Sequence, residues 1–188
     1  LAIKKEKIYI TQKGVYPPYF IPISSSPRNS YRLVYTSVPD RGLDILLDIF
    51  PKIRKEVPQA TLHIYCGWDL GMLKEEYRKR AELLYRKTNI DGVFREGTKK
   101  HSDLAKDLLV SGLMLYPSHE VPKAGFYAET SCIAAIEAQA AGCPVIASNR
   151  GALSESILNG KTGILIDGDP FFKSYQDKFV KETVSLLN

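Results

Sequence analysis

The chain alternates between short apolar runs rich in β-branched residues and longer segments in which apolar residues recur every three or four positions. The first pattern is typical of buried strands, and the second is typical of helices that bury one face. The helical spacing is clearest in Leu43, Leu46, Leu47, Phe50 and Ile53. Because the two kinds of segment alternate, the pattern predicts an α/β fold: a doubly wound sheet of parallel strands joined by crossover helices.

The pattern also places the individual elements. We expect strands near residues 7–11, 32–36, 61–66, 93–96, 113–116, 144–147 and 163–166. We expect helices near residues 42–55, 70–87, 102–109, 130–141, 152–158 and 170–187. In the last helix, the spacing predicts that Phe171, Tyr175, Phe179 and Leu186 face the sheet. A Pro- and Ser-rich stretch, residues 16–30, has the composition of a linker.

Composition narrows the class of protein. With 188 residues, 44% hydrophobic and 25% charged, the chain is close to an average soluble domain, and no apolar run reaches the roughly 20 residues of a membrane span. Its 3 cysteines lack CxxC spacing and sit in apolar stretches, which favours reduced thiols and a cytoplasmic location. The formal net charge of +5 is spread along the chain, so we expect a solvated surface and no nucleic-acid partner.

Ligands of open parallel sheets bind at the carboxyl ends of the strands, so the turns that follow strands are the places to search for a site. Four such turns stand out, at residues 38–42, 67–69, 97–98 and 117–129. Neither GxGxxG nor GxxxxGK[ST] occurs, which removes the main support for dinucleotide and P-loop binding.

No metal site is predicted. The histidines, His63, His101 and His119, lack HxH or HExxH spacing, and only His119 lies in a loop that could reach a ligand near Glu129. The stretch 167–169 reads Asp-Gly-Asp, but it precedes Pro170 and is better explained as a turn that caps a helix.

The most specific stretch is residues 129–148, in which Glu129 and Glu137 are separated by seven residues and Gly142 ends the predicted helix. Eight helical steps would put the two carboxylates about 12 Å apart along the axis. The free N–H groups of a helix start between them suit a phosphate. One hypothesis is that Glu129 binds sugar hydroxyls, Glu137 binds ribose hydroxyls, and a diphosphate is bound by the backbone of Thr130, Ser131, Cys132 and Ile133. The alternative is that Glu129 merely begins a helix and Glu137 points to solvent.

These residues resemble a known family. Residues 129–148, with Gly151, Glu155 and the run 160–165, look like the Glu-x7-Glu region of the C-terminal, donor-binding domain of retaining glycosyltransferases. This is the glycosyl transferases group 1 type, built from two Rossmann-like domains in the GT-B fold. Residues 7–15, 33–47 and 60–67 resemble three further segments of that domain, in the same order. The resemblance implies that residues 1–30 are a first strand and linker from a missing N-terminal domain and that residues 31–188 are the nucleotide-sugar-binding domain.

The match to the family is incomplete at the phosphate-binding residues. The family often carries an Arg and, five residues later, a Lys that clamp the diphosphate; here Thr36 and Arg41 stand at those positions. Arg41 can still make a bidentate phosphate contact, and Lys123 is the candidate for the second cation. Cys132 stands where the family has a glycine. By analogy with the family, backbone groups from Arg95 to Gly97 are expected to contact the base.

The resemblance implies a retaining transferase that moves a sugar from a nucleotide diphosphate donor to a glycan or other hydroxyl acceptor. Arg41 and the helix start would stabilise the leaving phosphate, and Glu129 would position the sugar. The acceptor would be held by the absent domain, so this chain alone is expected to be inactive; neither cofactor nor metal is expected, and peripheral membrane association belongs to the full-length enzyme. Two alternatives stay open: a sugar-nucleotide epimerase of similar fold, and a non-catalytic nucleotide- or sugar-binding module.

Overall fold

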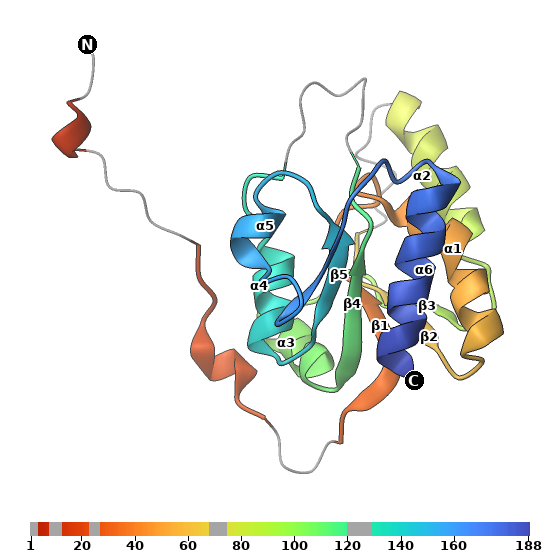
Figure 1. The fold of residues 1–188 in the computed structure, drawn as a ribbon, viewed down its shortest axis with the longest axis horizontal. Coiled ribbons are helices and arrows are strands. Elements are labelled where there is room, and N and C mark those ends of the chain that lie inside the picture. Colours follow the sequence, from red (N-terminus) through yellow and green to blue (C-terminus); the bar gives the residue numbers. More distant parts are fainter. Residues whose placement is uncertain (1–3, 8–12, 23–26, 68–74, 120–128) are drawn as a thin grey trace.

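The structure is a computed structural model that describes residues 4–7, 13–22, 27–67, 75–119 and 129–188 (Figure 1). Within these residues, six strands form one sheet: β1 (Asn29–Tyr35), β2 (Thr61–Ile64), β3 (Val93–Arg95), β4 (Ser111–Tyr116), β5 (Val145–Ser148) and β6 (Gly163–Ile166). Their order is β3-β2-β1-β4-β5-β6, and every neighbouring pair is parallel. This order is that of a doubly wound Rossmann-like sheet, which confirms the predicted fold class.

Helices cover both faces of the sheet. They are α1 (Leu43–Glu56), α2 (Glu75–Lys87), α3 (His101–Leu109), α4 (Ile133–Ala140), α5 (Leu153–Ser156) and α6 (Lys173–Leu187). Figure 1 shows α1, α2 and α6 on one face and α3, α4 and α5 on the other. Two short 3-10 turns, η1 (Lys5–Lys7) and η2 (Pro17–Phe20), precede β1, and η2 contacts α3. Right-handed crossovers explain this arrangement, because strands laid down in opposite directions from β1 place their helices on opposite faces.

The core lies around the two central strands. β1 and β4 are covered on both faces, and accordingly their second halves are apolar and buried without alternation. The predicted inner face of α1 is confirmed, since Leu43, Leu46, Leu47, Phe50 and Ile53 are all at most 1% exposed. These side chains belong to the same buried core as the central strands, and α1 contacts β4, which fixes the start of α1 at the carboxyl edge of the sheet.

The predicted elements agree with the observed ones to within a few residues, with two exceptions. Lys7 belongs to η1, and the rest of the expected strand 7–11 lies outside the described residues. In α6, Tyr175 and Phe179 are buried as predicted, whereas Phe171 and Leu186 are 53% and 49% exposed. Phe171 precedes the helix, and the buried row of α6 runs in steps of four through Tyr175, Phe179, Thr183 and Leu187, which points Leu186 outward.

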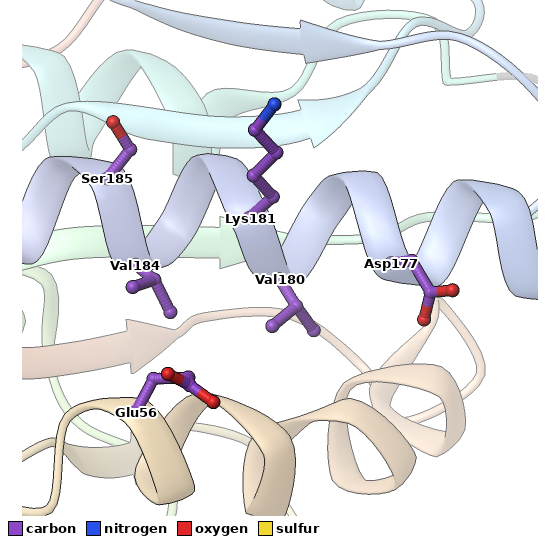
Figure 2. Close-up of a pocket in the computed structure, with 6 residues that line it drawn as sticks. All are labelled: Glu56, Asp177, Val180, Lys181, Val184 and Ser185. Atoms are coloured by element: carbon purple, nitrogen blue, oxygen red, sulfur yellow. The ribbon is translucent and has the colours of Figure 1, made fainter.

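A pocket of about 370 Å³ lies between α1 and α6 (Figure 2). It is lined by Glu56 of α1 and, on α6, by Asp177, Val180, Lys181, Val184 and Ser185. Figure 2 shows Val180 and Val184 pointing toward α1. Because Glu56 ends α1, and crossover helices run antiparallel to the strands, the pocket lies toward the amino edge of the sheet, away from the edge where ligands of this fold bind.

Candidate functional site

The candidate site lies at the carboxyl ends of β1, β4 and β5. The strand order reverses between β1 and β4, because β2 and β3 lie to one side and β5 and β6 to the other. Ligands of doubly wound sheets bind outside the strand ends at this switch point. The segments that follow these three strands are residues 36–42, 117–119 and 149–152, and they meet the segment that begins at Glu129.

Gly42 brings the β1–α1 loop against the end of β4. Its φ of 93° is in the left-handed region, and a Cβ atom at this position would overlap the carbonyl of Pro117. Only glycine allows both the conformation and the close approach. As a result the preceding residue, Arg41, reaches the site, and its Nη1 lies 3.6 Å from Oε2 of Glu129.

Glu129 is held from three sides. Its carboxylate Oε2 accepts a hydrogen bond from the Tyr116 hydroxyl at 2.9 Å, and its carbonyl accepts one from the Ala152 N–H at 2.7 Å. Gly151, with φ of 53°, packs so closely that a Cβ there would overlap the Glu129 backbone. The residue is 7% exposed, so its carboxylate is largely removed from water and lies among these partners and Arg41.

Tyr116 is a site residue that sequence reasoning missed. Burial raises its pKa well above the usual value of 10, so the hydroxyl keeps its proton and acts as a donor to Glu129 at neutral pH. Nothing in the local sequence distinguishes this tyrosine from the other buried residues of its strand. Its position as the last residue of β4, beside the switch point, emerges only from the sheet order.

α4 starts at Ile133, three residues later than predicted, with Cys132 as its N-cap. Residues 130–132 are therefore not helical, so the estimate of about 12 Å between the two glutamates, which assumed eight helical steps, does not apply. The N-cap makes no side-chain hydrogen bond to the helix start, and the N–H groups of Ile133 and Ala134 make no hydrogen bond to the described part of the chain, so these two groups can bind an anion. Thr130 is exposed and Ser131 is half-buried.

Cys132 is 3% exposed, and burial raises the pKa of its thiol to about 11. At neutral pH the thiol is protonated, and a protonated thiol is a poor nucleophile. The side chain therefore packs as a small apolar group between α4 and the core.

Glu137 lies inside α4 and is 8% exposed, so the alternative in which it points to solvent is wrong. Its Oε1 lies 2.7 Å from Nδ1 of His101, the first residue of α3. The two residues come from neighbouring helices on the same face of the sheet (Figure 1). Sequence reasoning gave His101 no place in the site, because its partner is 36 positions away in the chain.

The remaining predicted contacts are less direct. The Arg95 guanidinium lies 4.3 Å from the centre of the Tyr85 ring and donates to Thr88 Oγ1 at 2.8 Å, so this side chain is engaged with the end of α2. Gly97, with φ of 71°, forms the turn that leads toward α3 and His101. Lys123, the candidate second cation, lies outside the described residues.

His119 is fixed away from solvent. Its Nε2 lies 2.9 Å from Oδ1 of Asp44 in the first turn of α1, and its ring packs 4.7 Å from that of Phe171. This contact ties the end of β4 to α1. Within the described ranges, no three His, Cys, Asp or Glu side chains gather in a way that could hold a metal ion. In the same part of the chain, no helix combines the length and apolar character needed to cross a membrane.

The chain matches a known protein family over most of its length. Residues 29–178 match the family described as "Glycosyl transferases group 1". A D-inositol 3-phosphate glycosyltransferase of Arthrobacter sp. is 50% identical over 161 residues, which cover 82% of this chain and 36% of that protein. A GDP-mannose-dependent alpha-(1-6)-phosphatidylinositol monomannoside mannosyltransferase of Mycolicibacterium smegmatis is 31% identical over 131 residues, which cover 70% and 32%. The chain therefore spans about a third of the length of these relatives.

Solved structures show the same fold. The crystal structure of Anabaena Alr3699/HepE in complex with UDP and glucose aligns with a TM-score of 0.62, at 17% identity, over 93% of this chain and 50% of that one. At this identity the likeness concerns the fold. The architecture is that of the Rossmann-like half of a GT-B protein, as predicted from the resemblance of the motifs.

Proposed function

The chain belongs to the glycosyl transferases group 1 family, and from this premise we propose that it is the nucleotide-sugar-binding domain of a retaining glycosyltransferase. The observation that carries the proposal is the arrangement around Glu129. A cation, a buried carboxylate and the start of α4 meet at the switch point of the sheet, and a second buried carboxylate, Glu137, follows along the same helix. An extended sugar–diphosphate–ribose ligand would place its sugar at Glu129, its diphosphate at Arg41 and the start of α4, and its ribose at Glu137.

Each proposed role follows from the chemistry of sugar transfer. Breaking the bond between the anomeric carbon and the diphosphate leaves negative charge on the phosphate and positive charge on the sugar ring. Arg41 and the N–H groups at the start of α4, from Thr130 to Ile133, would stabilise the phosphate. Glu129, held by Tyr116, would accept hydrogen bonds from sugar hydroxyls and position the ring without covalent attack.

The nucleoside end of the donor would lie farther along α4. Glu137 would accept hydrogen bonds from ribose hydroxyls, and backbone groups between Arg95 and Gly97 would contact the base. Lys123 would supply a second cation. The donor would be bound by these protein groups with no metal or cofactor, because Arg41 and the helix start provide the positive charge that a metal supplies elsewhere.

The activity of the whole protein is part of the proposal, because the chain spans only about a third of its relatives. We propose that the remainder of the protein binds a hydroxyl acceptor and that this chain alone binds nucleotides without turnover. The relative from Mycolicibacterium smegmatis is a GDP-mannose-dependent mannosyltransferase that is named for phosphatidylinositol monomannoside. For a lipid acceptor, we propose a cytoplasmic enzyme that associates with the membrane surface.

A second candidate function rests on Thr36. This residue stands where the family often has an arginine, is 8% exposed, and its hydroxyl donates to Sδ of Met114 at 3.9 Å. A short buried hydroxyl supplies no charge to a diphosphate. A non-catalytic nucleotide-binding module would keep the fold and Glu137 while losing the ability to stabilise the leaving group.

Calorimetric titration with GDP and UDP, with and without EDTA, tests the proposal. We expect weak binding that is unchanged by EDTA. Glu137→Gln should weaken nucleotide binding by about 1.5–3 kcal/mol, because ribose hydroxyls lose a charged acceptor. Glu129→Gln should leave nucleotide binding unchanged and lower transfer from the sugar donor in the longer protein.

Glu56→Gln at the opposite edge of the sheet is the matched control and should change neither property. Equal losses of nucleotide affinity from the Glu129 and Glu137 variants would contradict the assignment of sugar and ribose to separate carboxylates. Nucleotide binding by the longer protein without sugar transfer from any nucleotide sugar would favour the non-catalytic module.

A further inference from the structure

His101 and Glu137 form a pair with very unequal access to water. The side chain of His101 is 73% exposed and that of Glu137 is 10% exposed, and Nδ1 lies 2.7 Å from Oε1. Because an ionised carboxylate only accepts hydrogen bonds, Nδ1 must carry the proton. The exposed imidazole therefore stands over one oxygen of a largely buried carboxylate, at the start of α3.

The second carboxylate oxygen of Glu137, Oε2, has a different environment. Among the described residues it makes no hydrogen bond to a protein group, although the carboxylate as a whole is nearly buried. A buried carboxylate usually fills its acceptor positions with protein or water donors. Oε1 accepts a hydrogen bond from His101, whereas Oε2 can still accept one from a donor outside the protein. This arrangement suits a ligand hydroxyl.

We propose that His101 is a positioning residue of the ribose subsite, which fixes the carboxylate of Glu137 so that Oε2 faces the ribose of a bound nucleotide. This inference rests on the proposed ribose role of Glu137. Without the Nδ1–H donor, the carboxylate can rotate about its last side-chain torsions and either oxygen can turn to water. The hydrogen bond from His101 restricts this rotation before the nucleotide binds, so the Glu137 side chain loses less conformational entropy on binding.

The side-chain chemistry allows a sharp substitution series. In His101→Asn the amide nitrogen occupies nearly the place of Nδ1, so the hydrogen bond to Oε1 can be kept. In His101→Gln the amide nitrogen is one bond farther out, close to the place of Nε2, and the hydrogen bond is lost. His101→Ala removes the donor altogether. Lys106→Ala on the exposed side of α3 is the matched control, because Lys106 is exposed and pairs with the exposed Asp103 of its own helix.

Titration of the purified chain with GDP and UDP measures the effect. We expect His101→Ala to weaken binding about threefold to tenfold, the usual net value of one hydrogen bond. His101→Asn should restore most of the affinity, and His101→Gln should not. His101→Asn should keep the denaturant midpoint of the parent, and His101→Ala and His101→Gln should lower it only slightly, because water can take the place of the exposed imidazole as the donor to Glu137.

Two double perturbations distinguish the positioning of Glu137 by His101 from a general effect of His101 on the structure. In a Glu137→Gln background, His101→Ala should cause no further loss, because the group that it positions is already altered. In the parent, removal of the 2′- or 3′-hydroxyl from the nucleotide should weaken binding, and this penalty should shrink in His101→Ala.

The outcomes distinguish a failure of the His101 role from a failure of the proposed function. If Glu137→Gln weakens nucleotide binding but His101→Ala changes it less than twofold, or if Gln rescues as well as Asn, the role of His101 is overturned and the proposed function stands. If Glu137→Gln binds as tightly as the parent, the ribose role and this inference are overturned together.

Discussion

Arg41→Ala is the most direct perturbation of the proposed phosphate site. Arg41 lies beside Glu129, with its Nη1 3.6 Å from Oε2, and its side chain is 33% exposed. A charge-assisted contact to a phosphate contributes about 1.5–3 kcal/mol when it is shielded from water. Since a third of the side chain is in water, screening reduces this value, and the lower end of the range applies. About 1.5 kcal/mol corresponds to roughly a tenfold loss of affinity.

The loss should depend on the phosphates of the ligand. Calorimetric titration should show that Arg41→Ala binds GDP or UDP about tenfold more weakly than the parent and binds guanosine or uridine with unchanged affinity. Arg41→Lys is the matched control: it keeps the charge but not the bidentate geometry, so its affinity should be intermediate.

The stability of the Arg41→Ala variant is a second test. Removing the arginine leaves the buried carboxylate of Glu129 with the Tyr116 hydroxyl as a donor, so the free energy of unfolding should fall only modestly, by about 1 kcal/mol or less. If nucleosides and nucleoside diphosphates lose affinity equally, Arg41 acts through the fold, and the phosphate role is refuted. If neither affinity changes, Arg41 does not contact the phosphates.

Two further predictions follow from the geometry. Gly151→Ala should lower the free energy of unfolding by about 2 kcal/mol or more, because φ is 53° and the new methyl group would overlap Glu129. Gly160→Ala is the control: φ is 77° but the space around it is open, so chemical denaturation should show a loss of only about 1 kcal/mol. Burial lowers the pKa of His63 below its usual 6.5, so the unfolded chain binds the proton first; stability should be full above about pH 6.5 and fall as pH drops toward the folded pKa. Denaturation at several pH values should show a smaller slope between pH 7 and 5 in His63→Gln, and an equal slope would contradict this reasoning.

Much of the fold could be predicted from local patterns. The inner face of α1 and the runs of β1 and β4 are apolar because both faces of the central strands are covered, and that requirement is visible in the sequence itself. The Glu129 and Glu137 pair and Arg41 are singled out by their short motifs together with the resemblance to the family, because burial periodicity alone does not distinguish them from other polar residues. The end of the last helix was less predictable, because Leu186 and Leu187 are equally apolar and only packing against the sheet decides which one is buried.

The tertiary structure decided which residues complete the site. Tyr116 donates to Glu129 from 13 positions away, and His101 donates to Glu137 from 36 positions away. Gly151 supports the backbone of Glu129 through a contact that no spacing rule describes. Periodicity reports whether a side chain faces the core, because burial repeats with the helix or strand. It carries no information about which strand ends become neighbours. That is set by the order of the sheet, in which β1 and β4 lie side by side although β2, β3 and the helices α1, α2 and α3 lie between them in the chain.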